Sequence, residues 1–405
     1  MHAFRPTLKS HSAAAQRAPA TAWSTVATTT ATTARMEFYG YSDCTELLNK
    51  HARVIITPHG GCRVLLYALT DGPNAIHLDH DLSLGPHGKW ESGDAAAGDE
   101  QHPGWKWGGD RSATGDPFGP SGGRFDVGPE FQSSGPDLRQ GGHPALFFGS
   151  WELVGGAPGA DGTAAAVTMQ SGVCKYTGLQ LTRRFELASD SAELTVAQTM
   201  RNAGDAPSLR VNHWGRTFVP GGGIAIVPLP PDGYSRFPNK FVTYAFGSAE
   251  GGHAILFEPS EPDSVRVRDN FVEVTAQTRM RHEKIGMDST AGWMAYISRA
   301  GTMLTKHFAV HPERVYGEMA GLTCCVFYYR DRLVELEPIG PLENLGPGEE
   351  ACFVEHWNLL PMPFPAEGTD LDLQQVSELV AESCSSAGYV PIEDASHDLS
   401  LKTRG

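Results

Sequence analysis

Residues 178–220, GLQLTRRFELASDSAELTVAQTMRNAGDAPSLRVNHWGRTFVP, decide the fold class. The stretch holds three short apolar runs, 178–187, 192–202 and 208–219, and the turn signal Asn202-Ala203-Gly204-Asp205 separates the second from the third. Apolar runs of this length bounded by turn residues are typical of β-strands. The stretch therefore predicts three consecutive strands.

Similar runs continue on both sides of this stretch. They are 164–169, 253–258, 264–275, 293–298, 302–310, 322–329, 332–338 and 351–358. More than ten strands at this spacing, with no helices between them, indicate a large antiparallel β-sandwich or barrel. No fixed-period repeat is present, which counts against a propeller or solenoid.

The N-terminal part of the chain adds a strand pair and a long loop. Residues 53–57 and 62–69 are apolar runs on either side of Pro58-His59-Gly60-Gly61, which predicts strand, turn and strand. Residues 85–142 contain 15 Gly and 6 Pro among 58 residues, so we expect a long loop. Long ordered loops in compact proteins are more often functional than not.

The C-terminal region differs from the rest. Leu373, Val376, Leu379 and Val380 follow helical spacing, which predicts one short amphipathic helix docked on the body. The expected organisation is a leader over 1–35, a β-sandwich over 36–365 and an acidic tail with this helix over 366–405.

The first 35 residues have the composition of an organelle-targeting segment. They contain Arg5, Lys9, Arg17 and Arg35 and no acidic residue, within a background of Ala, Ser and Thr. This composition is typical of transit peptides, and it also suits a disordered extension with no role in import. A transit peptide would place the protein in a mitochondrion or plastid, and otherwise we expect it in the cytoplasm.

The overall charge narrows the class of partner. Lys and Arg number 32 against 47 Asp and Glu, a net charge of −15. A binder of nucleic acid or of an anionic membrane would need a basic surface, so neither partner is expected. No stretch approaches the roughly 20 apolar residues of a membrane helix.

The sequence contains no strong metal or cofactor motif. The seven cysteines are odd in number, no C-x-x-C is present, and Cys324-Cys325 lie in an apolar run, so buried free thiols are expected. Two imidazoles and two carboxylates alternate over His77-Leu78-Asp79-His80-Asp81, but on a strand they point to both sides. We therefore expect neither a metal nor a cofactor.

Four features could carry chemistry. They are His143 in Gly141-Gly142-His143-Pro144-Ala145; His213, Trp214 and Arg216 in the run 210–217; Glu335 and Glu337, which share one side of a strand opposite Val334 and Leu336; and Trp105, Trp107 and Arg111 in the long loop. Imidazoles and carboxylates transfer protons, while tryptophan faces and arginine are common in sugar sites. Equally, the glutamates could be solvated strand residues and His213 a core histidine.

The order of these features resembles the galactose mutarotase-like family, which includes the aldose 1-epimerases. The resemblance covers about residues 37–360, through Asp71-Gly72-Pro73-Asn74, His143 before Trp151-Glu152-Leu153, Asn212-His213, and Pro347-Gly348-Glu349 before the final strand. It implies an all-β antiparallel supersandwich, to which the helical spacing noted above adds a short C-terminal helix.

The resemblance also implies an activity and roles for residues. His213 corresponds to the general acid on the ring oxygen, His143 to the earlier histidine, and Glu337, or Glu335 if the register differs, to the general base. We favour an aldose 1-epimerase-like isomerase acting on a small sugar, as a monomer or homodimer. A non-catalytic carbohydrate-binding protein and a polysaccharide lyase on the same type of sandwich are the alternatives.

Overall fold

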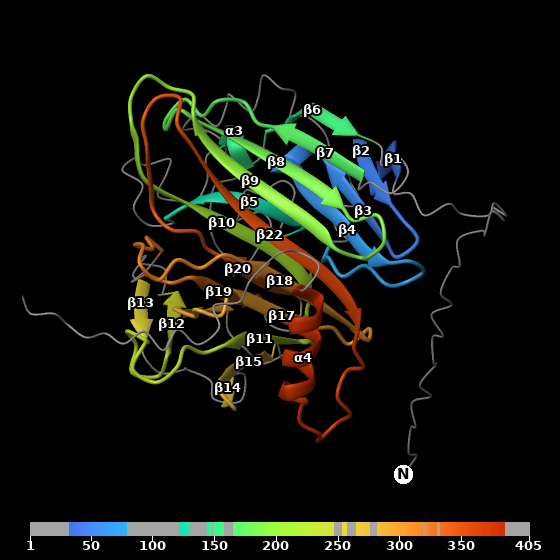
Figure 1. The fold of residues 1–405 in the computed structure, drawn as a ribbon, viewed down its shortest axis with the longest axis vertical. Helices are drawn as coiled ribbons and strands as arrows, with labels where there is room; N and C mark the ends of the chain where they lie inside the picture. Colours follow the sequence, from blue (N-terminus) through green and yellow to red (C-terminus); the bar gives the residue numbers. More distant parts are fainter. Residues whose placement is uncertain are drawn as a thin grey trace, which may run out of the picture.

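A computed structural model gives the fold of the chain. It describes residues 32–78, 121–129, 144–147, 149–157, 165–246, 253–256, 265–275, 282–318, 321–329 and 333–384. Within these ranges the protein is built from two large antiparallel sheets that face each other (Figure 1). The β-sandwich predicted from the apolar runs is confirmed.

The first sheet, called sheet A, has twelve strands among the described residues. In chain order they are β1 (Thr32–Phe38), β2 (Tyr41–Leu48), β3 (Ala52–Thr57), β4 (Arg63–Leu69), β5 (Gly123–Gly128), β10 (Ser208–Pro220), β12 (Phe241–Phe246), β13 (His253–Leu256), β16 (His282–Met287), β19 (Cys324–Tyr329), β20 (Leu333–Pro338) and β21 (Glu343–Leu345). Across the sheet the order is β1-β2-β3-β4-β5-β10-β20-β19-β16-β12-β13, and β21 pairs with β10. This order brings β5, β10 and β20 together at the centre.

The second sheet, sheet B, has ten strands in the described part of the chain. They are β6 (Glu152–Ala157), β7 (Ala165–Gln170), β8 (Leu179–Leu187), β9 (Leu194–Asn202), β11 (Ile224–Pro228), β14 (Val265–Arg268), β15 (Phe271–Thr275), β17 (Trp293–Ile297), β18 (Thr302–Phe308) and β22 (Glu350–Pro361). The order across the sheet is β14-β15-β11-β17-β18-β22-β9-β8-β7-β6. Short helices α1 (His59–Cys62) and α3 (Pro144–Phe147) lie in connections.

Burial patterns show how the sheets are covered. Strands β8 and β9 alternate buried and partly exposed residues, as expected when one face packs on the core. Strands β18 and β20 bury every residue, so both of their faces are covered. Such strands are the places where polar side chains can be held away from water.

The predicted C-terminal helix is confirmed as α4 (Leu373–Cys384), drawn in red in Figure 1. Leu373, Val376 and Val380 are buried against Ile226 of β11 and Ile297 of β17. The helix therefore covers part of the outer face of sheet B, and the apolar spacing in the sequence marks the side that docks.

Two predictions about local structure are wrong. The run 264–275 is not one strand, because Asp269 and Asn270 both have positive φ and turn the chain between β14 and β15. Residues 123–128 of the predicted long loop form β5, paired with β10. Polar and apolar residues alternate over Gly123-Arg124-Phe125-Asp126-Val127, and the high glycine content obscures this pattern.

Other sequence expectations have mixed outcomes. Five cysteines are free and buried as expected, whereas Cys352 is free and exposed. Strand β1 begins at Thr32, so the last four residues of the expected leader pair with β2, and residues 1–31 lie outside the described residues. Within the described ranges, no helix is long and apolar enough to span a membrane.

Candidate functional site

Strand β10 divides its side chains between two environments. Thr217 accepts a hydrogen bond from Lys306 Nζ of β18 at 2.9 Å, and His213 stacks on Phe353 of β22, so these residues face sheet B. Because successive side chains alternate, Trp214 and Arg216 lie on the opposite, outer face of sheet A. The site is built on this outer face.

The register of the neighbouring strands adds charged residues to the same face. Arg216 lies opposite Arg124 and Trp214 opposite Asp126 in β5. Thr217 lies opposite Leu336 of β20, so Leu336 also faces sheet B. Its neighbours Glu335 and Glu337 therefore lie on the outer face. Lys284 of β16 joins them through the intervening strand β19. We call Arg124, Asp126, Arg216, Lys284, Glu335 and Glu337 the charged cluster.

Ion pairs connect the members of the charged cluster. Arg216 donates from Nε to Glu335 Oε1 and from Nη1 to Asp126 Oδ2, the latter at 2.9 Å. Arg124 Nη2 lies 3.2 Å from the same Asp126 oxygen. Lys284 Nζ lies 2.8 Å from Glu337 Oε2. Three cations and three carboxylates thus form one continuous set.

Trp214 lies at the centre of the charged cluster. The Arg216 guanidinium carbon is 4.6 Å from the centre of the Trp214 ring system, and Lys284 Nζ is 4.4 Å from it. Cations at these distances are attracted to the negative face of the indole. The ring therefore fixes the positions of two of the three cations.

The charged cluster is buried, and this alters its protonation. No side chain in it is more than 8% exposed. Burial raises the pKa of the Glu335 carboxyl, and the charge of Glu337 raises it further, while Arg216 opposes both effects. Burial alone would lower the pKa of Arg216, but Glu335, Asp126 and Glu337 hold it well above its usual value. Arg216 is therefore a permanent cation beside a carboxyl whose pKa is raised.

Some polar atoms of the site have no hydrogen-bond partner among the described residues. They include Asp126 Oδ1, Glu335 Oε2, Glu337 Oε1 and the indole Nε1 of Trp214. Buried polar groups are nearly always paired, because an unpaired one costs free energy. Three of these atoms are acceptors and one is a donor, a combination that suits a polar ligand that offers hydroxyls.

The structure brings together four of the predicted site residues. Glu335, Glu337, Trp214 and Arg216 meet on one face of sheet A. The shared side of Glu335 and Glu337, expected from their spacing, is observed, but both are buried rather than solvated.

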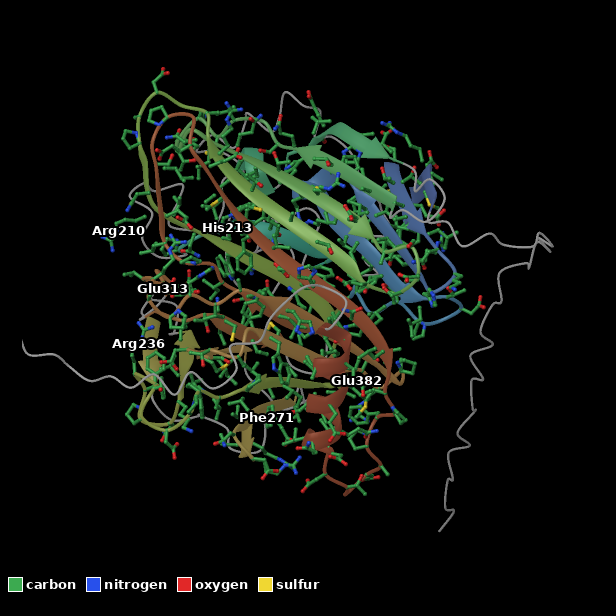
Figure 2. The ribbon with its side chains drawn as sticks, viewed as in Figure 1. Arg210, His213, Arg236, Phe271, Glu313 and Glu382 are labelled. Carbon is green, nitrogen blue, oxygen red and sulfur yellow. The ribbon has the colours of Figure 1, made fainter. Side chains whose placement is uncertain are left out.

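His213 is not part of this group. Its ring stacks between Phe125 and Phe353, and Nε2 donates to the Ala351 carbonyl oxygen at 3.2 Å. Burial lowers its pKa to about 3. Figure 2 labels it on β10, and strand alternation separates it from Glu335 and Glu337 by the thickness of the sheet. The residue expected as the general acid lies in the core, because β10 places odd-numbered residues inside the sandwich.

The remaining predicted site residues cannot be placed. His143, Trp105, Trp107 and Arg111 lie outside the residues that the structure describes. Their roles stay predictions. Within the described ranges, no group of three or more His, Cys, Asp or Glu side chains is arranged to hold a metal ion.

Sequence reasoning missed three members of the charged cluster, Arg124, Asp126 and Lys284. The alternation around Arg124 and Asp126 could have identified a strand with these two on one face. Lys284 lies in the run His282–Met287, which has no such pattern, and only the sheet order brings it to the site.

Comparisons with known proteins identify the fold. No protein-family model matches the chain, and no curated protein matches it in sequence. Among solved structures it is similar to a galactose mutarotase-like protein from Clostridium acetobutylicum, with a TM-score of 0.53 and 10% identity over 82% of this chain and 99% of that one. It is also similar to a protein from Synechocystis sp. PCC 6803, with a TM-score of 0.50 and 11% identity over 81% of this chain and 99% of that one.

A third similar structure is longer than this chain. It is a TPR-domain containing protein from Parabacteroides distasonis, with a TM-score of 0.46 and 14% identity; the match spans 81% of this chain and 48% of that one. At these identities the likenesses show the fold alone. The chain therefore has a galactose mutarotase-like sandwich fold.

Proposed function

We propose that the protein is an aldose 1-epimerase-like isomerase that binds a neutral sugar at the charged cluster. The observation that carries the proposal is the pair Glu335 and Glu337, adjacent on one buried face of sheet A and each held by a cation. A galactose mutarotase-like fold supports it, since mutarotation is the reaction for which that fold is named.

The chemistry needs two proton transfers. Opening a sugar ring requires a proton at the ring oxygen and removal of a proton from the anomeric hydroxyl, and closing it reverses the roles. Two neighbouring carboxyls repel each other when both are ionised, which raises the pKa of one of them. Glu335, whose pKa is raised, supplies the proton, and Glu337 is the base.

The charged cluster also favours a particular class of sugar. Each of its three cations has a carboxylate partner in the cluster. A phosphate would have to compete with these carboxylates, whereas hydroxyls can bond to the unpartnered oxygens of Asp126 and Glu335 and to Trp214 Nε1. The proposal is therefore for an unphosphorylated aldose.

Anomer interconversion in freshly dissolved α-glucose and α-galactose, followed by NMR, tests the proposal. We expect acceleration over buffer, and a loss of about 100-fold or more in Glu335→Gln and in Glu337→Gln, the usual range for removal of an acid or base. Glu343→Gln, in an ion pair of β21 with Arg314, is the matched control and should retain full activity.

Three outcomes would overturn the isomerase proposal. One is buffer-rate interconversion across a panel of aldohexoses and their phosphates. Another is sugar binding, seen by saturation-transfer NMR, without faster interconversion, which would make the protein a carbohydrate-binding protein. The third is unsaturated products from an acidic polysaccharide, which would indicate a lyase.

A further inference from the structure

A second buried ion pair lies inside the sandwich, directly behind the charged cluster. Lys306 of β18 is fully buried, and its Nζ lies 2.9 Å from Glu355 Oε2 of β22. Glu355 also accepts hydrogen bonds from Gln198 Nε2 and from Trp357 Nε1, both at 2.8 Å. Lys306 Nζ lies 4.9 Å from the centre of the Trp357 ring system. We call Lys306 and Glu355 the inner pair.

The inner pair reaches across the interface to the strands that carry the site. Lys306 Nζ donates to Thr217 Oγ1 at 2.9 Å and to the Leu336 carbonyl oxygen at 3.5 Å. Thr217 follows Arg216 in β10, and Leu336 stands between Glu335 and Glu337 in β20. One ammonium group thus contacts a side chain of β10 and the backbone of β20, the two strands that supply the acid, the base and the arginine.

Glu355 makes an equally close approach to β10. A Cβ atom at position 215 would collide with Glu355 Oε1, so a side chain there would force neighbouring atoms to move. Gly215 lies between Trp214 and Arg216, so the carboxylate sits immediately behind the residues at the centre of the site. Burying two charges is costly, and their presence at this point calls for an explanation.

We propose that Lys306 and Glu355 are positioning residues for the charged cluster: from inside the sandwich they fix the relative placement of β10 and β20, and so of Arg216 against Glu335 and Glu337. The importance of that placement for catalysis rests on the proposed function. The placement itself is independent of whether the protein is an isomerase.

Electrostatics supports a link between the two faces of sheet A. Burial lowers the pKa of Lys306, whereas Glu355 and, more weakly, Glu337 raise it. Burial likewise lowers the pKa of Arg183 in β8, and Glu355 and Asp126 both oppose this shift. Groups inside the sandwich thus interact with carboxylates of the charged cluster through the sheet.

The test uses a variant that removes the pair as a whole. Lys306→Met alone leaves Glu355 without its cation and endangers folding, so the informative protein is the double variant Lys306→Met/Glu355→Gln. Replacing both partners of a buried pair by neutral residues of similar size is often tolerated. Lys306→Arg keeps the charge, and Lys240→Met, which removes a lysine paired with exposed Asp232, is the matched control.

The readout is the indole N–H resonance of Trp214, identified by its loss in Trp214→Phe. In the double variant we expect the Trp214 resonance to be displaced. Its chemical shift should also change with pH as Glu335 titrates, and the midpoint of that change should move by about half a pH unit or more. Lys306→Arg should restore much of the wild-type behaviour, and Lys240→Met should match wild type. A role limited to stability would move the thermal midpoint and leave both NMR readings unchanged.

The outcomes separate the two proposals. A folded double variant with the wild-type Trp214 resonance and midpoint overturns the positioning role, whether or not the protein interconverts anomers. An equal displacement in Lys240→Met overturns it as well, because the effect would not be local. If anomer interconversion is observed, kcat should fall about 10-fold or more in the double variant with little change in KM, since orientation rather than binding is disturbed.

Discussion

The two faces of sheet A at β10 hold buried charges in contrasting ways. On the inner face, both oxygens of Glu355 are engaged, by Lys306, Gln198 and Trp357. On the outer face, two carboxylates are neighbours on one strand, and Glu335 Oε2 has no partner among the described residues. The inner arrangement minimises the cost of burial, and the outer one retains hydrogen-bonding capacity.

This contrast separates a structural use of charge from a functional one. Carboxylates with every oxygen satisfied rigidify a packed core. Carboxylates crowded together acquire altered pKa values, which cluster at functional sites. Burial and, after it, the neighbouring charge of Glu337 raise the pKa of Glu335, so this carboxyl belongs to the second kind. Substitutions on the two faces should therefore fail in different ways.

The largest expected effect comes from breaking the inner pair. Lys306→Met leaves Glu355 charged, buried and short of a partner, and we expect a loss of about 3–5 kcal/mol in the free energy of unfolding. Urea denaturation at pH 7 measures it. Lys240→Met is the control and should leave the denaturation midpoint unchanged. A loss equal to that of the control would mean that the inner pair does not support the fold.

Acid should destabilise the protein through buried histidines. Burial lowers the pKa of His213 to about 3, so below pH 6.5 the unfolded chain takes up a proton that the folded chain refuses. Between pH 6.5 and pH 4 this costs about 3 kcal/mol of stability. His307, with a pKa lowered to about 4 by burial, acts in the same direction.

His213→Phe sharpens the acid prediction. A phenyl ring can stack between Phe125 and Phe353 without titrating, so the pH dependence of the unfolding free energy over this range should decrease. Thermal unfolding at several pH values tests it, with the substitution of partly exposed His311 by Phe as control. An unchanged pH dependence would contradict the assignment of His213 as a neutral core residue.

A smaller effect is expected at Gly215. In Gly215→Ala the new methyl group meets the Glu355 carboxylate and lies 3.1 Å from Pro338 Cγ, so neighbouring atoms must move. Overpacking of this kind costs about 1–3 kcal/mol. Gly172→Ala, whose methyl group would meet no atom within 4 Å, is the control for the same denaturation measurement. Equal stability of the two variants would show that β10 can shift away from Glu355.

Local patterns predicted most of the fold. Apolar runs identified β7 to β10 and β17 to β20, and helical spacing identified α4, because each is a property of a few consecutive residues. The face shared by Glu335 and Glu337 was predictable for the same reason. The contribution of Lys284 was not, since it depends on β16 pairing with β19 and β19 with β20.

The placement of His213 inside the sandwich was unpredictable for a similar reason. Its position after Asn212 suggested an acid, but whether an odd or even residue of β10 faces the site depends on which face of sheet A packs on sheet B. That choice is made by contacts with β18 and β22, more than 80 residues away in the chain. Periodicity defines two faces of a strand and leaves their environments open.

Glu335→Gln has the smallest expected effect on stability, and it tests the contrast between the inner and outer faces of sheet A most directly. Because the folded state raises the pKa of Glu335, ionising this group destabilises the fold as the pH rises above its unfolded value. Gln removes that penalty and still accepts a hydrogen bond from Arg216, which also keeps Asp126. We expect an unfolding free energy within about 1 kcal/mol of wild type at pH 7, in contrast to Lys306→Met. Urea denaturation of the two variants side by side measures the difference. If Glu335→Gln is as damaging as Lys306→Met, the outer carboxylates support the fold as the inner pair does, and their crowding is no evidence of a site.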